Sequence, residues 1–300
     1  MKVMHAAGDL GLPQVDYEQA GPAVLRMMVG AHLRRLREER GISREDAGYS
    51  IRGSGSKISR MELGRVALKE RDVADLLTLY GVSGQPECAT VLELAARASA
   101  SGWWRAYADH VPSWFEPCLG LEQGASVIRS YEIQCIPGLL QTEDYARAIV
   151  HLGHRAAGEE EVEARVRLRM RRQQVITRQD PARLWAIIDE GALRRPVGGP
   201  ETMRGQIQHL IDSVALGNVT VQVLPFHATA HAAAAGPITI LRFPEWELPD
   251  VVYLEQLNGA IYPDRPAELE RYWDAMNRLV TEAESPAMTV ETLHQILAET

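Results

Sequence analysis

Five residues near the N-terminus have the sizes and charges that reading DNA requires. They fall within one short segment and would share the outward side of a helix: Gly55, Ser56, Lys57, Ser59 and Arg60. Small, hydroxyl-bearing and cationic side chains can enter the major groove of DNA, where they touch base edges and phosphates. We therefore expect this segment to be a DNA-reading helix.

Two short helices joined by a tight turn are needed to present these side chains. Ser43 is a good N-cap for the first helix, and the acids Glu45 and Asp46 follow in its first turn. The segment 52–55, Arg-Gly-Ser-Gly, does not continue that helix comfortably, because two glycines raise the entropic cost of helical backbone. Ser54 then caps the second helix. The pattern predicts a helix-turn-helix behind a longer first helix.

The distribution of charge supports a nucleic-acid partner. Residues 30–74 contain eleven Lys or Arg against seven Asp or Glu, a net charge of +4, whereas the whole chain carries −8. A basic segment within an acidic protein is what a phosphate-binding module requires.

The motifs LRRLREERGISREDAGYSI (33–51) and SGSKISRMELGR (54–65) resemble the Xre-type, phage-repressor-like helix-turn-helix family. The resemblance implies an ion pair between Arg37 of the first helix and Glu62 of the recognition helix. One departure is Gly48, where the family pattern has an apolar residue. Glycine there costs the helix about 1 kcal/mol relative to alanine.

The same resemblance implies roles for the residues around the recognition helix. Those at its start and middle would read bases, and its cap and flanking cations would hold phosphate. The expected base-reading residues are Gly55, Ser56 and Arg60, and the expected phosphate-binding residues are Ser54, Lys57 and Arg65. Ser59 and Arg44 complete the expected DNA-binding set.

Length and composition favour more than one domain. Three hundred residues with 46% apolar content can bury two cores. We expect a flexible tail over residues 1–21, a helix-turn-helix domain of about five helices over 22–101, and a regulatory or partner-binding domain over 102–300. No apolar run is long enough to span a membrane, and the first residues do not form a secretory signal. Three cysteines without CxxC spacing indicate reduced thiols in a cytoplasmic protein.

The second domain is expected to be α+β with a small mixed sheet. The segments 183–188, 219–226, 238–243 and 251–257 are β-branched runs separated by turn residues, which is typical of strands. Residues 121–131 are ambiguous between strand and helix. Helices are expected at 142–150, 158–178, 200–215, 266–281 and 289–298. The arginines of 165–172 follow glutamates at a spacing of four, Glu161 before Arg165 and Glu163 before Arg167, so self-neutralising pairs are expected rather than a second nucleic-acid site.

The second domain offers few groups for catalysis or metal binding. His227 with His231, and His151 with His154, lack a third ligand nearby in sequence. Asp189 and Glu190 end a strand, but adjacent strand residues point to opposite faces. The segment 194–200 could hold an anion at the start of the following helix. We expect no cofactor, no metal and no enzymatic activity.

The second half also resembles a known class. WWRAYADHVPSWF, IPGLLQTEDYARAI, DEGALRRPVGGPETMRGQIQHL, VTVQVLPF and VVYLEQL occur in the order found in the C-terminal domain of a large actinobacterial class of two-domain regulators. This class is described as antitoxin-like and is often encoded beside a small partner protein. The resemblance implies a regulator that receives such a partner.

Three functions therefore compete. The favoured one is a homodimeric, sequence-specific regulator that binds a palindromic operator and whose second domain mediates dimerisation and response to a small protein. In the alternative, the second domain senses a small molecule in a pocket near Trp185, Glu190, His231 and Glu255. The least favoured function is an enzyme with a DNA-binding appendage.

Overall fold

The computed structural model of the chain describes residues 21–82, 84, 86–100, 102–228, 236–244, 248–263 and 265–300. It divides into two compact units. The first contains the described residues up to Ala106 together with Glu116–Gly124 and the described part of Phe243–Pro249. The second contains Tyr107–Phe115, the described part of Ala125–Arg242, and that of Asp250–Thr300.

The first unit is helical. Its helices are α2 (Pro22–Glu39), α3 (Arg44–Ser50), α4 (Gly55–Glu62), α5 (Glu70–Leu79), α6 (Pro86–Ala98) and α7 (Glu116–Gly124). The five helices expected before residue 101 are α2 to α6. A short 3-10 helix, η1 (Trp103–His110), leads from the first unit into the second.

Apolar stripes explain how these helices pack. On α2, Met28 and Val29 are fully buried, and α2 packs against α4, α6 and α7. On α5, Val73 and Leu77 are four residues apart, which places both side chains on the same side of the helix, and both are fully buried there. Gly81 follows α5 in the left-handed region, with φ +77°, which glycine adopts readily at a helix end.

The second unit is built on a mixed six-stranded sheet, as the α+β expectation requires. Its strands are β1 (Val127–Glu132), β2 (Arg183–Asp189), β3 (Val219–Leu224), β4 (Ile238–Arg242), β5 (Val251–Gln256) and β6 (Gly259–Ile261). The spatial order is β3-β2-β1-β4-β5-β6. Strands β1, β2 and β3 run parallel, whereas β4 pairs antiparallel with β1, β5 with β4, and β6 with β5.

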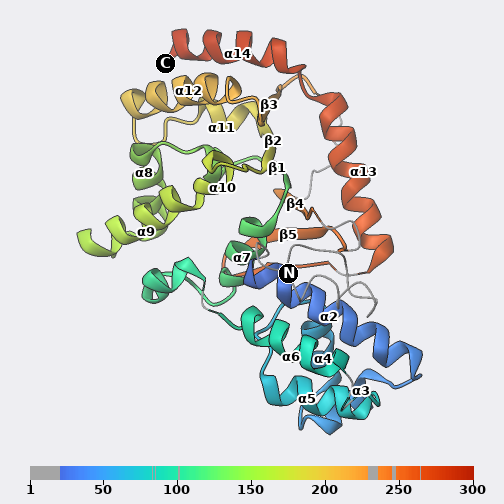
Figure 1. Cartoon of the computed structure of the whole chain (residues 1–300). Coiled ribbons are helices and arrows are strands. Elements are labelled where there is room, and N and C mark those ends of the chain that lie inside the picture. The colour runs from blue at the N-terminus through green and yellow to red at the C-terminus, as the bar shows by residue number, and fades with distance from the viewer. Residues whose placement is uncertain are drawn as a thin grey trace. The chain divides into compact units, whose positions relative to one another are not determined.

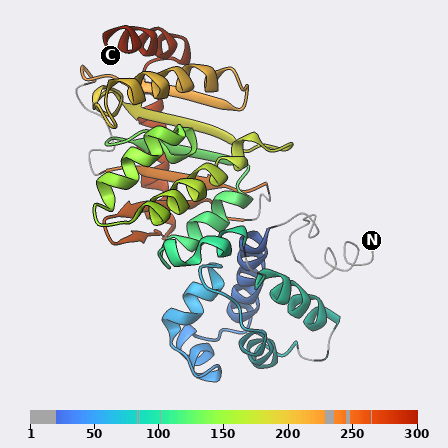
Figure 2. The same cartoon turned by 90° about the vertical axis from the view of Figure 1, so that its left-hand side faces the viewer.

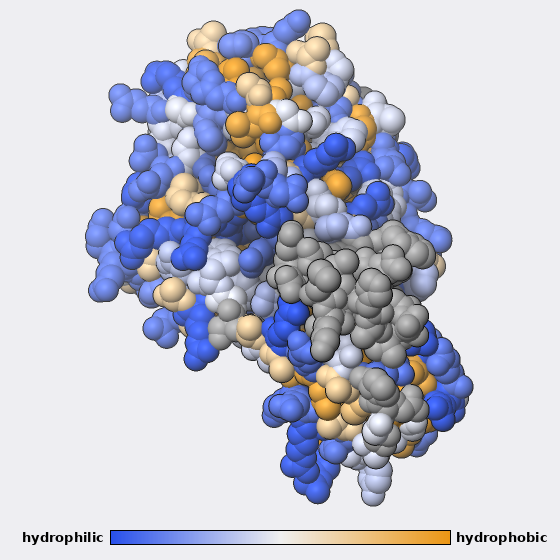
Figure 3. Space-filling model, viewed as in Figure 1, coloured by the Kyte–Doolittle hydropathy of each residue, from blue (hydrophilic) through white to orange (hydrophobic). Residues whose placement is uncertain are grey.

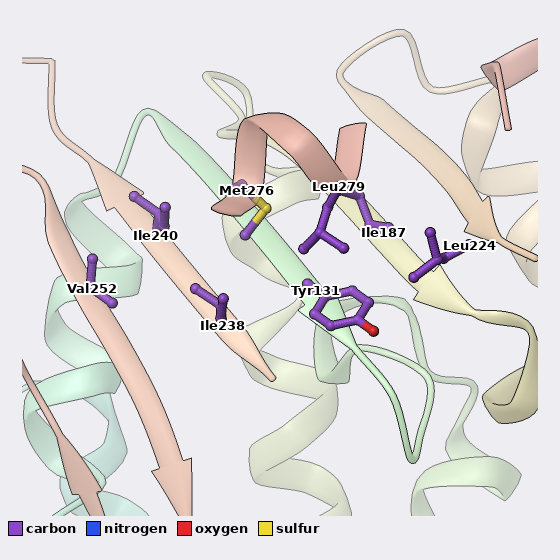
Figure 4. Close-up of a cluster of buried hydrophobic side chains, with 8 residues drawn as sticks. All are labelled: Tyr131, Ile187, Leu224, Ile238, Ile240, Val252, Met276 and Leu279. Carbon is purple, nitrogen blue, oxygen red and sulfur yellow. The ribbon is translucent and has the colours of Figure 1, made fainter. Parts of the chain in front are cut away.

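Helices cover both faces of this sheet (Figures 1 and 2). One face carries α8 (Glu143–Gly153), α9 (Glu159–Arg172), α10 (Gln174–Thr177), α11 (Glu190–Arg194) and α12 (Pro200–Val214). The other face carries α13 (Pro266–Glu282). Figure 4 shows the α13 side of the core, where Tyr131, Ile187 and Ile238 point from three strands toward Met276 and Leu279 of the helix.

The β3 edge of the sheet is closed by the last helices. Val223 N–H donates to the Thr289 hydroxyl at 3.0 Å, and Glu284 N–H donates to the Val223 carbonyl at 2.9 Å. These bonds occupy an edge that would otherwise offer unpaired groups to another chain. Thr289 lies inside α14 (Pro286–Glu299) and is not its cap. The N-cap of this helix is Ser285, and the helix begins three residues earlier than expected.

Other boundaries also differ from expectation. The segment 121–131, which is ambiguous between helix and strand by sequence, contains a helix followed by a strand: α7 ends at Gly124 and β1 begins at Val127. The long charged helix breaks at Gln173 into α9 and α10.

The visible surface of the second unit is mostly hydrophilic, with hydrophobic residues gathered in the region of α12 and α14 (Figure 3). Within the described ranges, every helix is too short or too polar to cross a membrane.

Candidate nucleic-acid interface

Helices α3 and α4 begin at serine caps that hold the motif in shape. The Ser43 hydroxyl accepts a hydrogen bond from Asp46 N–H at 3.0 Å, and the Ser54 hydroxyl accepts one from Lys57 N–H at 3.2 Å. Each cap satisfies a backbone donor that the first helical turn leaves unpaired. Ser54, expected at a phosphate, therefore has a structural role as well.

The turn between the two helices depends on Arg52 and Gly48. Arg52 has φ +53°, a left-handed conformation that is costly for a residue with a side chain. A Cβ atom on Gly48 would lie 2.7 Å from the backbone carbon of Ser54, closer than packed atoms allow. Glycine at position 48, the departure from the family pattern, thus lets the start of α4 approach α3.

Arg37 and Glu62 join α2 to α4. The Arg37 guanidinium donates from Nε to Oε1 of Glu62 at 2.5 Å and from Nη2 to Oε2 at 3.1 Å, and from Nη1 to the Ile42 carbonyl at 3.0 Å. The two side chains are only 8% and 2% exposed. The hydrogen bond that Arg37 donates to Glu62 raises the pKa of Arg37. This bidentate pair fixes the C-terminal end of α4 against the first helix.

The outer side of α4 presents the residues selected for DNA binding. Ile58, Met61 and Glu62 are buried, whereas Ser56 and Arg60 are exposed. Gly55, Lys57 and Ser59 are half-buried. The Arg60 guanidinium has no hydrogen-bond or ion-pair partner in the described part of the chain. It is therefore available to a base edge or a phosphate.

The other cations of the predicted set have partners. Lys57 Nζ donates to Oδ2 of Asp72 on α5 at 2.6 Å. Arg44 Nε lies 3.4 Å from Oε2 of Glu62, with 41% of the Arg44 side chain exposed. Arg65 follows α4 and is half-buried. Lys57 would have to leave Asp72 in order to hold a phosphate.

Two cations outside the predicted DNA-binding set, Arg52 and Lys69, lie beside the motif. Arg52 and Lys69 are exposed and line a groove of about 560 Å³ between the end of α3 and α5. Arg52 occupies the turn of the motif itself. Its place in the segment 52–55 between two capped helices was the signal that could have identified it.

The residues expected to line a pocket in the second unit include two that lie on opposite faces of the sheet. Trp185 packs on the α13 side of the sheet. Leu254 also packs on that side, so its neighbour Glu255 points to the opposite face. Glu190 is held by Arg194 at 2.6 Å and by Phe226 N–H at 2.9 Å. His231 lies outside the described residues. The sheet separates Trp185 from Glu255, and the pocket near Trp185, Glu190, His231 and Glu255 stays a prediction.

The strand-end acids and nearby arginines have structural partners. Asp189 caps α11 by accepting from Gly191 N–H at 2.8 Å. Arg194 bridges Glu190 and Glu299, both at 2.6 Å, and is thereby neutralised. Arg195 donates to the Gln134 carbonyl at 2.8 Å. These contacts neutralise Arg194, whereas Arg195, within the described part of the chain, is bonded only to a backbone carbonyl and keeps its positive charge.

On α9, one of the two expected ion pairs forms. Arg165 binds Glu161 at 2.8 Å. Glu163 instead binds Arg147 of α8 at 2.8 Å, and Arg167 is exposed. No group of three His, Cys, Asp or Glu side chains within the described ranges is arranged to hold a metal ion.

Two family models match the chain. A helix-turn-helix domain matches residues 29–89, which contain α3, the turn and α4. A domain of unknown function, DUF5753, matches residues 115–295. The chain belongs to the DUF5753 family. Comparison with curated proteins and with solved structures gave no match.

The DUF5753 region includes all six strands of the described sheet, together with α8 to α13. The helix-turn-helix match is the finding that bears on function, because domains of this kind bind DNA. The chain is accordingly a helix-turn-helix regulator whose second region is the DUF5753 domain.

Proposed function

We propose that this protein is a sequence-specific transcription regulator of the Xre type, in which α4 enters the major groove of its operator. The observation that carries the proposal is the division of α4 into two sides. Ile58, Met61 and Glu62 are buried, while Ser56 and the unpaired Arg60 face outward. An arginine at such a position can form a bidentate contact with a guanine edge.

The rigidity of the motif supports base reading rather than loose phosphate binding. The Arg37–Glu62 pair and the Ser54 cap fix both ends of α4, and Gly48 allows the helices to approach closely. Base contacts require side chains that are held in one register, whereas phosphate contacts tolerate more freedom.

The protein acts, in this proposal, as a cytoplasmic homodimer without catalytic activity. The DUF5753 domain mediates dimerisation and receives a small protein encoded by a neighbouring gene, in an antitoxin-like arrangement. The resemblance of the second half to two-domain regulators encoded beside a small protein supports this part. A dimer binds two half-sites about one helical turn apart, so the operator is expected to be palindromic.

Footprinting of the full chain on the DNA upstream of its own gene tests the proposal. We expect protection of a two-fold symmetric site that changes when the neighbouring small protein is added. Protection that is indifferent to the small protein would remove the partner from the proposal. An absence of protection at low salt would overturn DNA binding by α4.

A further inference from the structure

Glu132 is an ionisable residue of the second unit that has no hydrogen-bond or ion-pair partner among the described residues. It is the last residue of β1 and is half-buried. Its carboxyl group forms no hydrogen bond or ion pair with any described residue. A carboxyl group that is partly removed from water without a donor is costly, so its presence requires an explanation.

Arg169 of α9 lies near Glu132 and is also incompletely satisfied. It is half-buried and donates from Nη1 to the side-chain oxygen of Gln141 at 2.9 Å. Within the described ranges it has no carboxylate at ion-pair distance. A guanidinium carries five N–H donors, and a neutral amide oxygen compensates only part of its charge.

The surroundings hold Arg169 in place. The Gln141 side-chain amide also donates to the Ile136 carbonyl at 2.7 Å, and the Tyr145 hydroxyl accepts from Ile136 N–H at 3.1 Å. Gln141 and Tyr145 are fully buried. The guanidinium is therefore oriented by a fixed support, as in a binding site rather than on a mobile surface.

The position in the sheet is one that ligands favour. Strand order runs from β1 through β2 to β3 on one side and resumes with β4 on the other side of β1. Glu132 thus ends the strand at which the order of the sheet reverses. In open sheets with parallel strands, ligands bind beyond the carboxyl ends of the strands, and Glu132 lies at that end of β1 beside the parallel strand β2, while β4 on the other side runs antiparallel.

Glu132 and Arg169 also share one face of the sheet. Tyr131 points into the core under α13, so Glu132 points to the face that α8 and α9 cover. Glu255 of β5 points to the same face and is exposed. The nearby cations that act on this group of residues are Arg169, Arg172 and Arg195.

We propose that Arg169, Gln141 and Glu132 form a binding site for a small organic anion, whose carboxylate or phosphate group pairs with the Arg169 guanidinium. Gln141 orients the guanidinium, and Glu132 in its protonated form donates a hydrogen bond to the anion. The site lies within the DUF5753 domain and goes beyond the proposed function, because it does not require DNA binding.

The electrostatics agree with an anion rather than a cation. Burial, followed by the charge of Glu255, raises the pKa of Glu132 to about 8, against the opposing effects of Arg172 and Arg169. Burial, followed by the charge of Arg172, lowers the pKa of Arg169 to about 10. At neutral pH Glu132 is therefore mostly protonated while Arg169 is charged.

The remaining titratable groups of the cluster do not change this balance near neutral pH. Burial raises the pKa of the Cys135 thiol and raises the pKa of Tyr145 to about 12. Both stay neutral. As the pH rises through 8, Glu132 ionises and repels the anion, so binding is expected to weaken between pH 7 and pH 9.

Calorimetric titration of the full chain with acetate, citrate and inorganic phosphate, at constant ionic strength and pH 7, tests this site. We expect at least one probe to bind, and the comparison of citrate with phosphate distinguishes a carboxylate ligand from a phosphate ligand. Arg169→Gln should weaken binding at least tenfold, and Arg169→Lys should weaken it less. The matched control is Arg167→Gln, an exposed arginine on the same helix, which should leave binding unchanged.

Glu132→Gln tests whether Glu132 acts in its protonated form. The amide resembles the protonated carboxyl group, so the variant should retain binding at pH 7 and lose the weakening at pH 9. Loss of anion binding in this variant at pH 7 would show that the protonated carboxyl group does not act as the proposed donor, and it would overturn the proposal. The proposal would equally be wrong if no probe binds at millimolar concentration, or if Arg169→Gln and Arg167→Gln behave alike.

Discussion

Lys57 Nζ donates a hydrogen bond to Oδ2 of Asp72 at 2.6 Å, which joins α4, the proposed DNA-reading helix, to α5. The lysine side chain is 31% exposed and the aspartate side chain 12%. A cation expected at a DNA phosphate is therefore neutralised within the protein when DNA is absent. Binding through Lys57 requires this pair to exchange for a contact with phosphate.

Asp72→Asn is expected to strengthen binding to any DNA sequence, on the order of threefold to tenfold at low salt. The change removes a negative charge beside the proposed interface and releases Lys57 to a phosphate. The slope of log affinity against log salt should steepen by about 1. Fluorescence anisotropy with random duplexes measures both quantities. The control is Asp75→Asn, which removes an equal charge from the exposed side of α5. Equal gains in the two variants would show that Lys57 has no special part.

Arg60→Ala is expected to cost about 1–3 kcal/mol of binding free energy on the cognate operator and to relax specificity at one base pair. The reason is that an exposed arginine without a protein partner can form a bidentate contact with guanine. Competition binding against operator variants checks this. Arg34→Ala, which changes an exposed arginine on α2, is the control. A similar loss on random DNA would assign Arg60 to phosphate instead.

The motif could be predicted because its determinants are local in sequence. Ser43 and Ser54 cap helices that begin at the next residue, and Ile58 and Met61 form a stripe that the helical repeat places on one side. The Arg37–Glu62 pair joins residues far apart in sequence, and a family resemblance was needed to suggest it.

The candidate pocket could not be predicted in the same way. Alternation along β2 and β5 divides each strand into two faces, but only the pairing of the strands shows which faces coincide. Trp185 and Glu255 fall on opposite sides for this reason. Glu132 was missed because the segment before it read equally well as helix or strand, so its position at the end of β1 had no sequence signal.

Glu62→Ala is expected to destabilise the first unit by about 3 kcal/mol, because Arg37 would remain buried without its partner. Urea denaturation of the full chain, followed by probes in each unit, measures the effect. Glu38→Ala removes an exposed carboxylate that lies 3.4 Å from Arg37 and should cost less than about 0.5 kcal/mol. Indistinguishable midpoints for these two variants would contradict a structural role for the pair.

Arg52→Gly is expected to stabilise the first unit by about 0.5–1 kcal/mol. A left-handed conformation costs a residue with a side chain roughly 1–2 kcal/mol, and the greater freedom of glycine in the unfolded chain offsets part of that gain. Arg40→Gly is the control, since Arg40 has φ −90° and gains no relief. If Arg52 also touches phosphate, the stabilised variant should bind DNA more weakly. A destabilised Arg52→Gly variant would mean that its side chain, rather than its backbone conformation, matters to the fold.

Glu132→Gln is expected to remove a pH dependence from the stability of the second unit. The pKa of Glu132 is about 8 in the folded protein and about 4.3 when unfolded. Between these values the folded state holds a proton that the unfolded state releases, so wild-type stability falls as the pH rises from about 4.3 to 8. Above pH 8 the carboxyl group is ionised in both states and the loss is complete.

The variant should therefore match wild type near pH 4 and exceed it at pH 9 by up to about 5 kcal/mol, because the two pKa values differ by about 3.7 units. Denaturation midpoints across this range, read from the second unit, measure the difference. Glu160→Gln changes an exposed carboxylate on α9 and should follow wild type at every pH. Parallel curves for Glu132→Gln and wild type would show that the Glu132 carboxyl group is ionised at neutral pH, and the anion site would then lose its hydrogen-bond donor while Arg169 remained.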